Sequence, residues 1–161
     1  MGSTENNTPT VAVVVATYNG ATYLPLQLES IIQQTHKPSQ IIIIDDASSD
    51  DTVSIAHAFA AAHPGVVVVQ NETRLGYIKN FEKGMLLVNA SYVALSDQDD
   101  IWVPHKLEKL LELWFNAKNR NEEVFIGNEL QSKIVCNNLP LWSFLYSEDM
   151  SSIKREVLSE L

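Results

Sequence analysis

The sequence has few of the features that mark several common classes of protein. Its single cysteine, Cys136, excludes a disulfide within the chain and a cysteine-based metal cage. No stretch approaches the roughly 18 apolar residues of a transmembrane segment, and the polar residues 1–9 lack the apolar part of a signal peptide. Basic residues number 11 against 20 acidic ones, and the net charge of −9 disfavours nucleic acid as a partner. We therefore expect a cytoplasmic protein, with peripheral association at the inner face of the membrane left open.

The usual nucleotide-binding motifs are also missing. No Gly-x-Gly-x-x-Gly follows the first apolar run, and no P-loop is present, which excludes the classical dinucleotide-binding and P-loop designs. An acidic pair, Asp45 and Asp46, is similar to that of phospho-receiver domains, but it follows the second apolar run rather than the first. The four histidines show no metal-ligand spacing. Any nucleotide or metal site must therefore be built from other residues.

The pattern that is present alternates between apolar runs and amphipathic segments. Runs rich in valine and isoleucine at 11–16, 40–45, 66–70 and 92–96 are typical of strands covered on both faces. Helical spacing of apolar residues follows each run, with helices expected to begin near residues 23, 50, 76 and 104. This alternation predicts an α/β fold with a mainly parallel sheet, in a three-layer α/β/α sandwich.

Polar residues gather where each predicted strand ends. Residues 17–19, 45–46, 71–76 and 97–100 occupy these positions. In open parallel sheets, ligands bind beyond the carboxyl ends of the strands, so we expect these four clusters to meet at one edge. The sequence therefore predicts a single binding site there.

The acidic run at residues 97–100 (DQDD) admits two interpretations. Three carboxylates in four positions repel each other and raise each other's pKa unless a cation neutralises them. Mg²⁺ and Mn²⁺ accept such oxygen ligands, and Mg²⁺ commonly bridges to substrate phosphates. The alternative is a solvated acidic turn that caps the helix opening near Pro104. The run by itself leaves both interpretations open.

Four motifs taken together resemble the family 2 glycosyltransferases, which have the Rossmann-like GT-A fold. They are VVATYNG at 14–20, IDDASSDDT at 44–52, NETRLG at 71–76 and DQDD at 97–100, and the resemblance covers roughly residues 10–115. The form SDQDDIW at 96–102 is most similar to bacterial rhamnosyltransferase-type members, which act in polysaccharide biosynthesis. The resemblance implies the strand order 3-2-1-4. At Ala47 the family commonly has glycine, and we expect from this departure that the turn avoids positive φ.

The resemblance implies a metal-dependent, inverting transfer of a sugar from a nucleotide-diphosphate donor, UDP- or dTDP-linked, to a saccharide or lipid-linked acceptor. In the DXD motif, Asp99 would coordinate Mn²⁺ or Mg²⁺ with Asp97 beside it, and Asp97 would also face the ribose. Asp46, or its neighbour Asp45, would bond the pyrimidine base. The residues implied in donor binding are Ala16, Thr17, Tyr18, Asn19, Asp45, Asp46, Arg74, Gly76, Asp97, Gln98, Asp99 and Asp100.

The resemblance does not extend over the whole chain. We expect a disordered segment at 1–9, a nucleotide-sugar-binding domain at 10–115, and an atypical segment at 116–161 that is not similar to the usual acceptor half. The chain thus looks truncated to the N-terminal, donor-binding half, and the general base is expected in the missing half, so the catalytic residues stay unassigned. The alternative function is a catalytically incomplete nucleotide-sugar-binding fragment, or a subunit whose open face is covered by a partner or a second copy.

Overall fold

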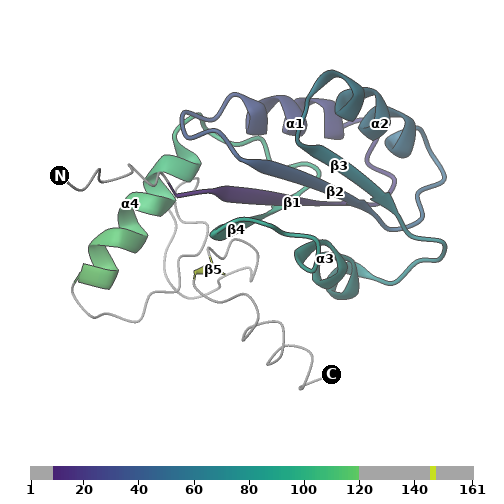
Figure 1. The fold of residues 1–161 in the computed structure, drawn as a ribbon. Helices are drawn as coiled ribbons and strands as arrows, with labels where there is room; N and C mark the ends of the chain where they lie inside the picture. Colours follow the sequence, from purple (N-terminus) through teal and green to yellow (C-terminus); the bar gives the residue numbers. More distant parts are fainter. Residues whose placement is uncertain (1–8, 120–145, 148–161) are drawn as a thin grey trace, which may run out of the picture.

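The computed structural model describes residues 9–119 and 146–147, and it is built around one twisted sheet (Figure 1). The strand order is β3-β2-β1-β4-β5, with the first four strands parallel, which confirms the predicted order. A short fifth strand, which the sequence analysis did not predict, pairs antiparallel with β4. The strands are β1 Val11–Thr17, β2 Gln40–Asp45, β3 Val66–Gln70, β4 Tyr92–Asp97 and β5 Tyr146–Ser147.

Helices cover both faces of the sheet. Alternate side chains of β1 point to opposite faces: Val13 joins the core formed with α1, α2 and α4, and Val14 joins the core formed with α3. Figure 1 shows α1 and α2 on one side of the strands and α3 on the other. The predicted three-layer α/β/α sandwich is therefore confirmed. The helices are α1 Leu24–Ile32, α2 Thr52–Ala62, α3 Tyr77–Met85 and α4 Lys106–Asn119.

Helix α3 lies unusually close to the sheet. A Cβ atom added at Gly84 would come within 2.5 Å of Val14 Cγ1 and 3.1 Å of Ile44 Cγ2, so only glycine allows this approach. The close packing carries the first residues of α3, Tyr77 and Asn80, to the carboxyl edge of the sheet.

The turn after β2 corrects one expectation. Ala47 has φ of +61°, so this turn adopts the left-handed conformation that the alanine was expected to avoid. The turn is imposed by Asp45, which accepts hydrogen bonds from the Ser48 backbone N–H at 2.8 Å and from the Ser48 hydroxyl at 2.5 Å. These bonds outweigh the steric cost of a Cβ in that region, about 1–2 kcal/mol.

The expected division of the chain, with boundaries after residues 9 and 115, stays a prediction. The polar stretch after residue 115 does not end the last helix, because α4 continues to Asn119. The expectations for residues 1–8, 120–145 and 148–161 lie outside the described residues. In the described part of the chain, no helix is long and apolar enough to cross a membrane.

Candidate functional site

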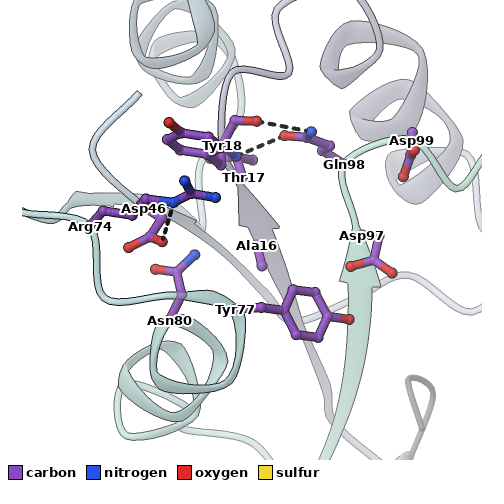
Figure 2. Close-up of a pocket in the computed structure, with 10 residues that line it drawn as sticks. All are labelled: Ala16, Thr17, Tyr18, Asp46, Arg74, Tyr77, Asn80, Asp97, Gln98 and Asp99. Carbon is purple, nitrogen blue, oxygen red and sulfur yellow. Dashed lines mark hydrogen bonds and ion pairs between the residues drawn. The ribbon is translucent and has the colours of Figure 1, made fainter. Parts of the chain in front are cut away.

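A cleft opens at the carboxyl edge of the sheet, between the ends of β1, β2 and β4 and the start of α3 (Figure 2). The polar clusters predicted to meet at this edge do meet there. One wall carries Asp46 and Arg74, the other carries Asp97 and Asp99, and Tyr18 lies between them. The lining residues are Ala16, Thr17, Tyr18, Asp46, Arg74, Tyr77, Asn80, Asp97, Gln98 and Asp99.

Asp46 is held as a charged carboxylate. Its Oδ1 accepts hydrogen bonds from the Leu75 N–H at 2.7 Å and from the Asn71 amide at 3.1 Å, and its Oδ2 accepts from the Gly76 N–H at 2.9 Å. Burial by itself would raise the pKa of Asp46, but these hydrogen bonds and the Arg74 charge outweigh it, and the pKa is lowered. Oδ2 thus accepts one of these three hydrogen bonds and Oδ1 accepts two.

Arg74 joins Asp46 to Tyr18. Its guanidinium carbon lies 3.9 Å from the centre of the Tyr18 ring, and its Nε lies 3.9 Å from Asp46 Oδ2. Figure 2 shows the guanidinium stacked against the ring. With 37% of Tyr18 exposed, the ring contributes a cleft wall more than core packing. The arrangement offers a cation and an aromatic surface beside a carboxylate.

Gln98 ties the acidic run to the end of β1. Its Oε1 accepts from the Tyr18 N–H at 2.9 Å, and its Nε2 donates to the Tyr18 carbonyl at 3.1 Å. Gly20 makes room for this amide, since a Cβ there would lie 2.0 Å from Gln98 Oε1. Because both ends of the amide are engaged, Gln98 acts here as a bridge between the acidic run and Tyr18.

In the wall that carries Asp97 and Asp99, neighbouring carboxylates repel each other. Burial raises the pKa of Asp97, a hydrogen bond from the Tyr77 hydroxyl opposes that rise, and the charges of Asp100 and Asp99 add to it. Burial and Asp97 together raise the pKa of Tyr77, so the phenol stays protonated and can donate. An approaching cation would relieve the repulsion among these carboxylates.

The carboxylates of this wall suit a hard divalent cation whose coordination shell is completed by water and by a bound phosphate compound. Asp97 and Asp99 both line the cleft and offer carboxylate oxygens. Among the described residues, no group of three or more His, Cys, Asp or Glu side chains is positioned to hold a metal unaided. Mg²⁺ commonly takes one or two carboxylates and fills its shell with water and substrate phosphates.

The first turn of α4 does not support the alternative that the acidic run caps this helix. The Leu107 N–H donates to Gln34 Oε1 at 3.1 Å, and the Lys106 N–H donates to the Val103 carbonyl at 3.1 Å. The helix is thus capped by a side chain from the segment after α1.

Four of the predicted residues lie beside the cleft without lining it. Asp45 is fully buried, and besides Ser48 it accepts from the Thr17 hydroxyl at 2.9 Å, so its oxygens are occupied. Asn19 accepts the Ser49 N–H at 2.9 Å, and Gly76 donates to Asp46 as described above. Asp100 is half-buried and does not line the cleft. These four residues lie next to the residues that line the cleft.

Two lining residues were missed, Tyr77 and Asn80. Tyr77, the first residue of α3, lines the cleft, and its hydroxyl reaches Asp97. Asn80 is buried, donates to the Ile44 carbonyl at 2.9 Å and accepts from Asn71 at 2.9 Å. In the sequence, the available signal for this site was a polar residue, Asn80, about one turn after Tyr77 on the same helix face.

Comparison with known proteins finds one family and several relatives. Residues 12–127 match the family described as "Glycosyl transferase family 2". The chain is 37% identical over 111 residues to the dTDP-rhamnosyl transferase RfbG of Shigella flexneri, covering 65% of this chain and 38% of RfbG. It is 30% identical over 141 residues to the putative teichuronic acid biosynthesis glycosyltransferase TuaG of Bacillus subtilis, covering 88% of this chain and 54% of TuaG.

Solved structures share the fold. TarS of S. aureus in complex with UDP superposes with a TM-score of 0.60 at 24% identity, over 68% of this chain and 33% of that one. The mannosyltransferase PcManGT of Pyrobaculum calidifontis, in complex with GDP-Man and Mn²⁺, superposes with a TM-score of 0.55 at 28% identity, over 58% and 28%. The chain therefore spans about a third to a half of the length of these proteins.

Proposed function

The chain belongs to glycosyl transferase family 2, and we propose that its cleft binds the nucleotide-diphosphate sugar of a metal-dependent, inverting sugar transfer. The observation that carries the proposal is the pairing of two unlike walls. One wall offers a carboxylate, a guanidinium and an aromatic ring, and the other offers two carboxylates under mutual repulsion. A nucleotide diphosphate bound with a divalent cation complements both walls.

The base is expected at the Asp46 wall. Oδ2 of Asp46 accepts one hydrogen bond, from the Gly76 N–H, and we expect it to accept a second from the imide N–H of uracil or thymine. Tyr18 and Arg74 supply a flat surface against which a planar base can pack. The similarity to a dTDP-rhamnosyl transferase supports dTDP-rhamnose as the first donor to test, with UDP-linked sugars second.

The diphosphate is expected at the Asp97–Asp99 wall. These two carboxylates would hold Mn²⁺ or Mg²⁺, which when bound offsets the diphosphate charge and stabilises it as a leaving group. Tyr77 orients Asp97 by donating a hydrogen bond to it, and Gln98 holds the acidic run against β1. The likeness to PcManGT, solved with GDP-Man and Mn²⁺, supports this use of a cation.

Donor binding is assigned to residues 10–115, and transfer is assigned to the whole protein. Inversion needs a general base that activates the acceptor hydroxyl, and no described residue is assigned that role. The name of TuaG, which refers to teichuronic acid biosynthesis, supports a role in polysaccharide synthesis. A saccharide or lipid-linked acceptor and a cytoplasmic location are parts of the proposal.

Calorimetric titration of the chain with dTDP and UDP, with Mn²⁺ and with a chelator, tests this function. We expect the nucleotide to bind at least about tenfold more tightly with Mn²⁺ than without. Asp99→Asn removes a cation ligand and should abolish that gain. Asp51→Asn is the matched control, since Asp51 is exposed at the start of α2, away from the lining residues. Equal affinity with the chelator, or an intact Mn²⁺ effect in Asp99→Asn, would refute the proposal.

A further inference from the structure

Lys106 is buried in a way that its residue type rarely is. Only 1% of its surface is exposed, and its Nζ has no hydrogen-bond partner among the described residues. The ammonium lies 4.1 Å from the centre of the Trp102 ring, whose own Nε1 is likewise unsatisfied within the described chain. A cation–π contact compensates part of the desolvation of an ammonium. The rest of the desolvation cost must be offset by a negative charge.

The acidic run acts electrostatically on Lys106. Lys106 is the first residue of α4 and follows the acidic run by one short loop. Burial lowers the pKa of Lys106 to about 8, against the opposing attraction of Asp100 and Asp97. The lysine therefore remains largely protonated at neutral pH, and the same interaction acts on Asp97, where the Lys106 charge favours the carboxylate.

The backbone around Lys106 is fixed by polar side chains of the α1 segment. Gln34 accepts from the Leu107 N–H at 3.1 Å and donates to the Val103 carbonyl at 2.8 Å. The Ser30 hydroxyl accepts from the Trp102 N–H at 3.0 Å. These bonds hold Trp102 and Val103 before Lys106 and Leu107 after it. The start of α4 therefore cannot move the ammonium into solvent without breaking them.

We propose that Lys106 is a positioning residue that serves as the resident counter-cation of the acidic run. It offsets the charges of Asp97 and Asp100 while the cleft is empty, and it repels a divalent cation that approaches alone. The anionic diphosphate removes that penalty, so the cation binds well only together with the nucleotide. The inference rests on the proposed function, and it adds the reason why metal and nucleotide would bind cooperatively.

The test measures Mn²⁺ affinity without nucleotide, by electron paramagnetic resonance on the full chain at pH 6.5. Lys106→Met removes the charge and keeps an apolar stem for the Trp102 ring. We expect it to bind Mn²⁺ about threefold or more tightly than the unsubstituted protein, because a fixed positive charge has been removed near the cation. Lys109→Met is the control, since Lys109 is half-exposed on the same helix and paired with Glu112 at 2.6 Å. It should change Mn²⁺ affinity by less than about twofold.

A second measurement separates a role in charge from one in packing. The ratio of Mn²⁺ affinities with and without dTDP or UDP should fall about threefold or more in Lys106→Met, and stay unchanged in Lys106→Arg, which keeps the charge. Unchanged or weaker Mn²⁺ binding by Lys106→Met in the nucleotide-free protein overturns the proposal. So does an equal effect of the Arg and Met variants.

Each remaining outcome also has a meaning. If the unsubstituted protein binds neither Mn²⁺ nor nucleotide, the proposed function fails, and the counter-cation role fails with it. If it binds both while Lys106→Met behaves like the unsubstituted protein, only the role of Lys106 is refuted. If Lys106→Met does not fold and Lys106→Arg does, the empty cleft requires the charge, as proposed. If neither folds, Lys106 serves packing and the proposal is overturned.

Discussion

Asp46 is the most heavily bonded carboxylate of the cleft, and its replacement by asparagine should destabilise the fold at neutral pH. The carboxylate accepts from the Leu75 N–H, the Gly76 N–H and the Asn71 amide, with only 3% of the residue exposed. Asparagine keeps one acceptor oxygen. Its amide nitrogen must then face a backbone N–H or the Asn71 amide, which places two donors against each other.

The magnitude follows from what is lost. A hydrogen bond to a charged group contributes about 1.5–3 kcal/mol, and an unsatisfied buried donor costs about 1–3 kcal/mol. At least one such bond is lost in Asp46→Asn, so we expect a loss of about 2–4 kcal/mol in the free energy of unfolding at pH 7. The Arg74 pair adds little, because 63% of the Arg74 side chain is exposed.

The effect should also depend on pH. The pKa of Asp46 is lower in the folded protein than its ordinary value of 3.8, so its stabilisation is complete above that value. The stabilisation is lost as the pH falls through the folded pKa, where the unsubstituted protein also carries a neutral side chain. The difference between the two proteins should therefore shrink below about pH 4.

Urea unfolding at a series of pH values between 7 and 3 checks both parts. Asp51→Asn makes the same chemical change at an exposed position that forms no capping hydrogen bond, and it should cost less than about 0.5 kcal/mol. If Asp46→Asn is no more destabilising than Asp51→Asn, or if its cost does not change with pH, the hydrogen-bond argument for Asp46 is wrong.

Three further predictions concern neighbouring positions. Gly20→Ala places a Cβ 2.0 Å from Gln98 Oε1, so it should displace the Gln98 amide. We expect Mn²⁺-dependent nucleotide binding, measured by calorimetry, to weaken by about tenfold. Unchanged binding would show that the contact between Gln98 and Tyr18 is dispensable. Ala47→Gly relieves a φ of +61° and should raise the free energy of unfolding by about 1 kcal/mol in urea; a loss of stability would contradict it. Tyr77→Phe removes a bond that lowers the pKa of Asp97, so the acid limit of Mn²⁺-dependent binding should move to higher pH, and an unmoved limit would exclude the contact.

The residue pattern determined the sheet and the edge at which the site lies. Runs such as Ile41–Ile44 must be covered on both faces, and the helical segments between them impose parallel strands. Once the strands are parallel, their carboxyl ends share one edge, so Asp46 and Asp97 had to lie at the same edge of the sheet. The order of the strands came from family resemblance, since periodicity alone does not rank neighbours.

Only the tertiary structure decided which member of each cluster lines the cleft. Asp45 and Asp46 are adjacent and chemically identical, yet one turns inward to bind Thr17 and Ser48, while the other meets the N–H groups before α3. The same holds for Tyr77, whose ring packs on Phe81 while its hydroxyl reaches Asp97. Several of these assignments depend on contacts between residues 28 to 30 positions apart, and local sequence carries no record of which distant residues meet. The burial of Lys106 is of this kind, because Gln34, which follows α1, accepts a hydrogen bond from the neighbouring Leu107 N–H and holds the start of α4.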